Sequence, residues 1–222
     1  MELLYTAHVP AGDGPFPTII ALHGWGANAH DLLGLAPILH GGEAIVLCPQ
    51  GPFAFQPGPQ MPPAYGWFPL SEGKPPDMAA VATAQGLLEI FIDDICERYP
   101  VDPRKLVLAG FSQGGFMAYL VALNDPERYA GLLAMSSWLP TEVVSTIDPH
   151  PAHEALPTLV VHGTEDPMIA IDRAYASRDA LLGLKVPLAF REYEMGHEIR
   201  PEALREIVMW LEEKVIHPIE IA

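Results

Sequence analysis

Short apolar runs that alternate with longer helical patterns constrain this chain more than any other feature. The runs are rich in branched residues and predict buried strands at residues 18–22, 44–47, 106–109, 131–135, 158–161 and 188–193. The patterns between them predict helices at residues 78–98, 113–124, 169–182 and 201–215. Such alternation is typical of an α/β fold, in which a mainly parallel sheet carries helices on both faces. We therefore expect a single α/β domain over residues 1–222, with residues 2–9 as an antiparallel edge strand.

Charge and composition exclude several classes of function. Twelve Lys and Arg against 28 Asp and Glu give a net charge of −16, which repels nucleic-acid phosphates and anionic lipid headgroups. The two cysteines, Cys48 and Cys96, are too few for a disulfide framework, and residues 1–14 lack the basic and apolar regions of a signal peptide. No apolar run approaches the roughly 20 residues that span a bilayer. We therefore expect a cytoplasmic protein with no nucleic-acid partner and no stable membrane insertion.

A G-x-S-x-G motif, Gly110 to Gly114, stands between a predicted strand and a predicted helix. A tight strand-to-helix turn needs small residues two positions on either side of the serine, because a Cβ there would collide with the neighbouring backbone. The motif predicts Ser112 as a nucleophile. The same turn directs the Gln113 backbone N–H and the helix N-terminus toward the place where a carbonyl oxygen becomes negative.

A serine hydroxyl is a poor nucleophile without a base. His197 follows the last predicted strand on a loop and precedes the last helix, which is where this strand and helix order places a base. His162 closes a strand and is more simply explained by a local hydrogen bond in its own turn. The other histidines lie at edges, at termini or in a Pro-rich loop without metal-like partners, so we expect no metal site.

The base needs a carboxylate that fixes its tautomer, and in this chain order it lies between the serine and the histidine. Asp166 fits best, because it follows the strand at residues 158–161 and Pro167 fixes the turn after it. Glu165 is the near alternative, and Asp172 is a more remote one on the following helix.

A second oxyanion donor is expected in the loop after an early strand. Here this loop is residues 23–28, in which two glycines let the backbone turn its amides inward, and the Trp25 N–H is the expected donor. A turn with no catalytic part is the alternative. His23 is expected to brace the loop.

Residues 51–76 form a loop that is too long for an ordinary connection and is dense in prolines and aromatic residues. It is either a surface excursion stiffened by proline or a wall of the substrate site near the serine. Together with two later loops it supplies the expected substrate-binding residues, which are Phe55, Trp67, Phe68, Leu70, Trp138 and Met168.

The chain resembles the phospholipase/carboxylesterase family of α/β-hydrolases over nearly its whole length. The resemblance rests on LHGWG at residues 22–26, the Trp67-Phe68 pair, AGFSQGG at 109–115, HGTEDPMI at 162–169 and GHE at 196–198. It implies the same nucleophile, base, carboxylate and oxyanion donors, and hydrolysis of esters or thioesters without a cofactor. The chain departs from the family where Trp25 replaces a common leucine and where Pro69 and Leu70 follow Trp67-Phe68 in place of an acidic residue.

These expectations combine into a serine carboxylesterase that hydrolyses esters of small to medium apolar acids or alcohols through an acyl-enzyme. One alternative is an acyl-protein thioesterase or lysophospholipase with the same three residues. The alternative of another class is a non-catalytic binding protein on a hydrolase scaffold. The expected partner is a small-molecule ester, and a homodimer remains open.

Overall fold

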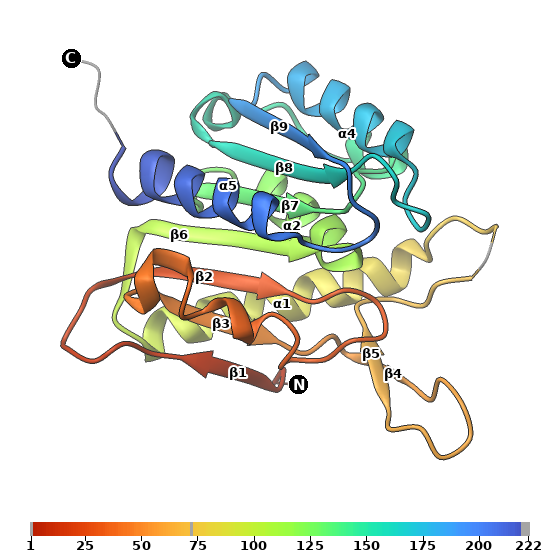
Figure 1. Ribbon diagram of the computed structural model, residues 1–222, viewed down its shortest axis with the longest axis horizontal. Coiled ribbons are helices and arrows are strands. Elements are labelled where there is room, and N and C mark those ends of the chain that lie inside the picture. The colour runs from red at the N-terminus through yellow and green to blue at the C-terminus, as the bar shows by residue number, and fades with distance from the viewer. Residues whose placement is uncertain (1, 72, 219–222) are drawn as a thin grey trace.

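A seven-stranded sheet organises the computed structural model, which describes residues 2–71 and 73–218 (Figure 1). Its strand order is β1-β3-β2-β6-β7-β8-β9, and every neighbouring pair is parallel except β1 with β3. Its strands are β1 (Tyr5–His8), β2 (Phe16–Leu22), β3 (Ile45–Pro49), β6 (Val101–Phe111), β7 (Gly131–Met135), β8 (Thr158–Gly163) and β9 (Leu188–Tyr193).

The predicted strands all form, and the predicted antiparallel edge strand is confirmed as β1, in which Tyr5 lies opposite Pro49. Three of the parallel strands, β3, β7 and β8, are buried at every residue. This explains why their sequences read as continuous apolar runs and not as an alternation, because helices cover both faces of the sheet.

Helices α1 (Met78–Arg98), α2 (Gln113–Asn124) and α4 (Ile171–Gly183) cover one face of the sheet, and α5 (Pro201–Leu211) covers the other (Figure 1). The α5 face also carries the short turns η1 (Leu33–Leu35) and η2 (Leu39–Gly42). The result is a three-layer α/β fold in which the carboxyl ends of the parallel strands meet at one edge (Figure 1).

Three segments of the chain contain short elements that the sequence prediction did not include. Within residues 51–76 the chain forms a hairpin of β4 (Phe53–Phe55) and β5 (Ala64–Gly66), which projects beyond the sheet (Figure 1). The segment after β7 contains α3 (Thr141–Val144) and η3 (Pro151–Ala155), and α5 passes at Leu211 into the π-helical turn η4 (Glu212–Ile216). Elements of three to five residues are too short to give a periodic signal, so the sequence did not indicate them.

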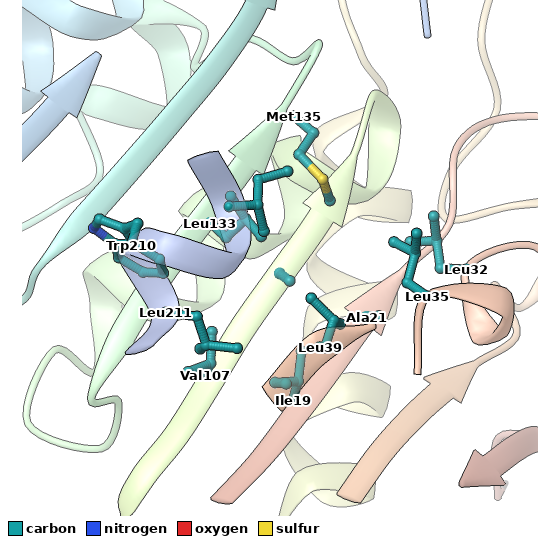
Figure 2. Close-up of a pocket in the computed structure, with 12 residues that line it drawn as sticks. Ile19, Ala21, Leu32, Leu35, Leu39, Val107, Leu133, Met135, Trp210 and Leu211 are labelled. Atoms are coloured by element: carbon teal, nitrogen blue, oxygen red, sulfur yellow. The ribbon is translucent and has the colours of Figure 1, made fainter. Parts of the chain in front are cut away.

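A small cavity of about 20 Å³ remains between the sheet and α5. Figure 2 shows its apolar walls, with Ala21 on β2, Val107 on β6, Leu133 on β7 and Trp210 on α5. Every residue that lines this cavity is apolar, so it offers no polar group for chemistry. Among the described residues, no helix combines the length and the apolar character required to cross a bilayer.

Candidate active site

Ser112 stands at the turn between the last residue of β6 and the first residue of α2. Its backbone has φ 54° and ψ −118°, an unfavourable conformation for a residue with a side chain. Neighbouring groups hold it in place. The Ser112 N–H donates to the Met135 carbonyl at 2.9 Å, and the Ser112 carbonyl accepts from Ser137 Oγ at 2.7 Å. The turn therefore presents the serine side chain at the carboxyl edge of the sheet.

Two glycines make this turn sterically possible. A Cβ at Gly110 would collide with the Gly114 carbonyl, and a Cβ at Gly114 would collide with the Leu22 carbonyl at the end of β2. Neither glycine has a positive φ, so each is needed for space and not for conformational freedom. This agrees with the steric requirement that the sequence motif predicts.

Asp166 and His197 form a hydrogen-bonded pair at the same edge. The Asp166 carboxylate is fully buried, and its Oδ1 accepts from the backbone N–H groups of Met168 at 2.8 Å and Ile169 at 2.9 Å. Its Oδ2 accepts from His197 Nδ1 at 2.7 Å. Because Nδ1 carries the proton in this bond, Nε2 of the neutral ring is left as the acceptor.

Gly163, the last residue of β8, allows the loop that carries His197 to approach. A Cβ at Gly163 would collide with the Met195 carbonyl and would come within 2.6 Å of the Gly196 carbonyl. The two alternatives to Asp166 lie apart from this pair. Glu165 and Asp172 are both exposed, and within the described chain neither makes a hydrogen bond to His197.

The chain next to Ser112 packs against His197. In the part of the chain that the structure describes, no hydrogen bond joins the Ser112 hydroxyl to His197. The ring of Phe111, the residue before Ser112, packs against the His197 ring at a centroid distance of 4.9 Å. Hydrogen bonds of this kind are often loose before substrate binds, so the arrangement permits general-base chemistry.

The loop after β2 lies directly beside Ser112. An added Cβ at Gly24 would come within 3.3 Å of the Ser112 Cβ, which shows how close the two backbones are. Within the described residues, the backbone N–H groups of Trp25 and Gln113 have no hydrogen-bond acceptor. Two unsatisfied donors beside a serine can bind a negative oxygen.

The β4–β5 hairpin fixes the position of this loop. The Gly26 N–H donates to the Tyr65 carbonyl at 2.8 Å, and the Tyr65 N–H donates to the Ala27 carbonyl at 3.0 Å. The Trp25 indole stacks on the Phe55 ring with centroids 4.2 Å apart and planes 12° apart. The hairpin and the loop are therefore joined by two backbone hydrogen bonds and by ring stacking.

The side chain of Gln113 is a structural feature that the sequence did not indicate. It is fully buried, its Oε1 accepts from the Trp67 N–H at 2.8 Å, and its Nε2 donates to the Phe68 carbonyl at 2.7 Å. The Trp67 indole N–H in turn donates to the His23 carbonyl at 2.9 Å. These bonds tie the long loop to the residue that follows Ser112. The sequence showed only that a polar residue, Gln113, follows Ser112 in the motif, and not what its side chain contacts.

The expected substrate-binding residues differ in their placement, and the first of them, Phe55, is half-buried on β4. Trp67 and Phe68 lie in the core, with 1% and 0% of their surface exposed, and Trp138 is buried at 7% with the Arg173 guanidinium over its ring. The expectation that Trp67 and Phe68 form a substrate wall is therefore wrong, because they hold the loop in place and present almost no free surface. Met168 and Leu70 are exposed on the surface.

Two further histidines are buried and support the site. His23 Nε2 accepts from the Gly51 N–H at 2.9 Å, so its Nδ1 carries the proton and donates to the Gly24 carbonyl at 2.8 Å. His162 Nε2 donates to the Ile169 carbonyl at 2.8 Å, as its place in the turn predicts. Burial lowers the pKa of both rings, which keeps them neutral.

Comparison with known proteins identifies the family. The sequence profile of the phospholipase/carboxylesterase family matches residues 6–215, which is nearly the whole chain. The chain belongs to the phospholipase/carboxylesterase family. This membership makes the protein a serine hydrolase of the esterase type.

Proteins similar to this chain carry names that refer to more than one kind of bond. The acyl-protein thioesterase 1 of Gibberella zeae is 28% identical over 93% of this chain and 94% of its own length. The carboxylesterase of Bacillus cereus has the same fold, with a TM-score of 0.79 at 22% identity over 95% of this chain and 93% of its own. The acyl-protein thioesterase 2 of Zea mays gives a TM-score of 0.74 at 23% identity, over 96% of this chain and 100% of its own.

Proposed function

We propose that the protein hydrolyses carboxylic esters through an acyl-enzyme formed on Ser112. In this proposal His197 is the general base and Asp166 orients it. The Trp25 and Gln113 backbone N–H groups form the oxyanion hole. The observation that carries the proposal is the 2.7 Å bond from His197 Nδ1 to a buried carboxylate, at the sheet edge where the strained Ser112 turn also lies. A buried, fully hydrogen-bonded carboxylate has little reason to contact an accessible histidine unless it orients that ring.

The reaction follows from the roles of these groups. His197 Nε2 takes the Ser112 proton as Oγ attacks the ester carbonyl carbon, and the carbonyl oxygen becomes negative facing the two N–H groups. As the intermediate collapses, the bond to the leaving oxygen breaks and His197 gives that oxygen its proton. Water then repeats the sequence on the acyl-enzyme, which releases the acid and restores Ser112.

The substrate class follows from the surroundings of the site. Apolar rings and aliphatic side chains from Phe55, Phe111 and Ile199 lie around it, which favours small to medium apolar acids or alcohols. Cleavage of thioesters is the second candidate, and the observation that favours it is the name of the Gibberella zeae relative. Both cysteines are free, which suits a reducing compartment such as the cytoplasm.

A serine-directed probe tests the proposal. A fluorophosphonate is expected to label Ser112, located by peptide mapping, and Ser112→Ala is expected to lose both the label and turnover, by about 10⁶-fold in rate. Ser145→Ala, on an exposed turn outside the site, is the matched control and keeps both. A Ser112→Ala variant that retains a tenth of wild-type activity would contradict the proposal, and absence of any adduct would support a non-catalytic binding protein.

A panel of esters separates the two substrate classes. p-Nitrophenyl acetate, butyrate and octanoate compare acyl lengths, and butyryl-CoA with a lysophospholipid compares the thioester and lysophospholipase alternatives. We expect kcat/KM to be higher for the uncharged p-nitrophenyl esters than for butyryl-CoA or the lysophospholipid. A preference for the thioester above every ester would favour the second candidate.

A further inference from the structure

A groove of about 250 Å³ opens beside His197 on the α5 face of the sheet. Its apolar walls come from Leu32 and Leu35 on one side and from Phe111 and Ile199 on the other. Phe111 packs against the His197 ring, and Ile199 follows His197 by two residues. Two of the groove's lining residues therefore adjoin the histidine. None of the substrate-binding residues expected from the sequence lines it.

The direction of proton transfer determines which half of an ester lies in this groove. His197 must donate its proton to the leaving oxygen, so that oxygen has to come within hydrogen-bond reach of the imidazole. The alcohol part of the ester, which is bonded to the leaving oxygen, therefore lies on the His197 side of the site. The oxyanion donors, Trp25 N–H and Gln113 N–H, instead lie beside Ser112 and face the carbonyl oxygen.

We propose that this groove binds the leaving alcohol or thiol of the substrate, and that it accepts uncharged or cationic leaving groups of apolar build and rejects anionic ones. This inference rests on the proposed function, because it uses His197 as the proton donor. It goes further in assigning the two halves of the substrate to different surfaces.

The charge preference follows from the groups that line the groove. Asp31 is its one charged lining residue; it is exposed and makes no ion pair within the described chain. The nearest cation along the chain, Arg200, is already engaged, because its guanidinium donates to Glu198 Oε1 at 2.8 Å and to the Glu194 carbonyl at 2.7 Å. An anionic leaving group would therefore meet the Asp31 carboxylate, and no lysine or arginine lines the groove to offset it.

Gly34 offers a way to fill the groove without disturbing its walls. It lines the groove in η1, its φ is ordinary, and an added Cβ would meet no atom within 4 Å. Gly183, at the end of α4, has the same open space but does not line the groove, and it lies at the far end of the sheet from Ser112. Gly34→Phe and Gly183→Phe therefore form a matched pair.

The bulk test varies one half of the ester at a time. For Gly34→Phe we expect kcat/KM for 3,3-dimethylbutyl butyrate, relative to methyl butyrate, to fall by about 10- to 100-fold. The ratio of methyl octanoate to methyl acetate should stay within about 2-fold of wild type. Gly183→Phe should move neither ratio. Ile199→Ala, which enlarges the groove, is a second variant and should raise the first ratio.

The charge test uses two esters of nearly equal shape. Butyrylcholine carries a quaternary ammonium, and 3,3-dimethylbutyl butyrate is its uncharged counterpart. Asp31→Asn should lower the ratio of their kcat/KM values by about 3- to 10-fold, because one exposed charge acts through a water-like medium, and added salt should weaken the effect. Asp13→Asn, an exposed aspartate before β2 at the opposite end of the sheet, should leave the ratio unchanged.

The outcomes separate the failure of this inference from failure of the proposed function. If Gly34→Phe shifts the acyl ratio and spares the alcohol ratio, the groove binds the acyl chain and the inference is wrong. It is equally wrong if neither ratio moves, or if Asp31→Asn leaves the cation preference intact. In those cases wild type still cleaves methyl butyrate and Ser112→Ala does not. If Ser112→Ala cleaved methyl butyrate as fast as wild type, the proposed function itself would be wrong.

Discussion

Replacing Asp166 with asparagine tests the orientation of His197 with little change in shape. The asparagine carbonyl oxygen can still accept from the Met168 and Ile169 N–H groups, at 2.8 and 2.9 Å in the native protein. Its NH₂ group then faces His197 Nδ1, where the carboxylate accepted at 2.7 Å. An NH₂ group donates, so the imidazole must turn its unprotonated nitrogen toward it and carry its proton on Nε2.

This tautomer cannot accept the serine proton, and the charge that stabilises the imidazolium is also lost. We expect kcat/KM to fall by about 10⁴-fold, which corresponds to about 5.4 kcal/mol of transition-state stabilisation. The fold should survive, because the two backbone bonds to residue 166 remain. We expect the free energy of unfolding to change by less than about 2 kcal/mol.

The assay is hydrolysis of p-nitrophenyl acetate together with urea unfolding. Glu165→Gln is the matched control, since Glu165 is the adjacent carboxylate and is exposed. It should leave kcat/KM within about 2-fold of wild type. If Glu165→Gln costs more than Asp166→Asn, the carboxylate is misassigned and the reasoning from the His197 hydrogen bond fails.

Three further predictions concern the scaffold around the site. Trp67→Ala should lower the free energy of unfolding by about 3–5 kcal/mol and lower kcat/KM for all esters by the same factor. A changed order of ester preference with an unchanged Tm would contradict this. Because burial lowers the pKa of His23 and His162, the unfolded chain binds more protons just below its histidine pKa of about 6.5. The free energy of unfolding should therefore rise with pH from about 5 to 7, by at most about 1.4 kcal/mol per pH unit for each histidine. Urea unfolding at several pH values measures this, and a free energy of unfolding that does not change over that range would refute the prediction. Val107→Ile should fill the cavity under α5 and stabilise by about 0.8 kcal/mol, and a lower Tm would mean overpacking.

The fold was predictable because its elements are long and their apolar patterns are strong. Helices α1 and α2 begin and end at the predicted residues, as do strands β7 and β9. The hairpin in residues 51–76 was not predictable, because its two three-residue strands pair with each other and dock on residues 26–27 through contacts distant in sequence. A periodic pattern of apolar residues arises where one face of an element packs against a sheet or a layer of helices. The hairpin packs against neither, so its sequence shows no such pattern.

The same difference explains which parts of the site could be predicted. The candidate residues Ser112, Asp166 and His197 each follow a predicted strand, so the topology alone brings them to one edge. The role of the Gln113 side chain depends on two backbone groups of a loop 45 and 46 residues away, and a single sequence carries no sign of that pairing. Trp67 misled for a related reason. An aromatic residue in a loop is typical of both a pocket wall and a core anchor, and only its burial decides.

The close backbone contacts around Ser112 and His197 explain why rigidity and accessibility coexist at this edge. Gly110, Gly114 and Gly163 all stand where a Cβ would collide with a backbone carbonyl, so β6 and β2 are packed main chain to main chain against the start of α2, and β8 is packed in the same way against the His197 loop. Such contacts leave no side chain to rearrange, and the strained φ of Ser112 is therefore held by the surrounding backbone. The side chains of the site are then free to face outward. Substrate preference can change through residues such as Gly34 and Asp31 in the groove, whose substitution leaves this backbone framework untouched.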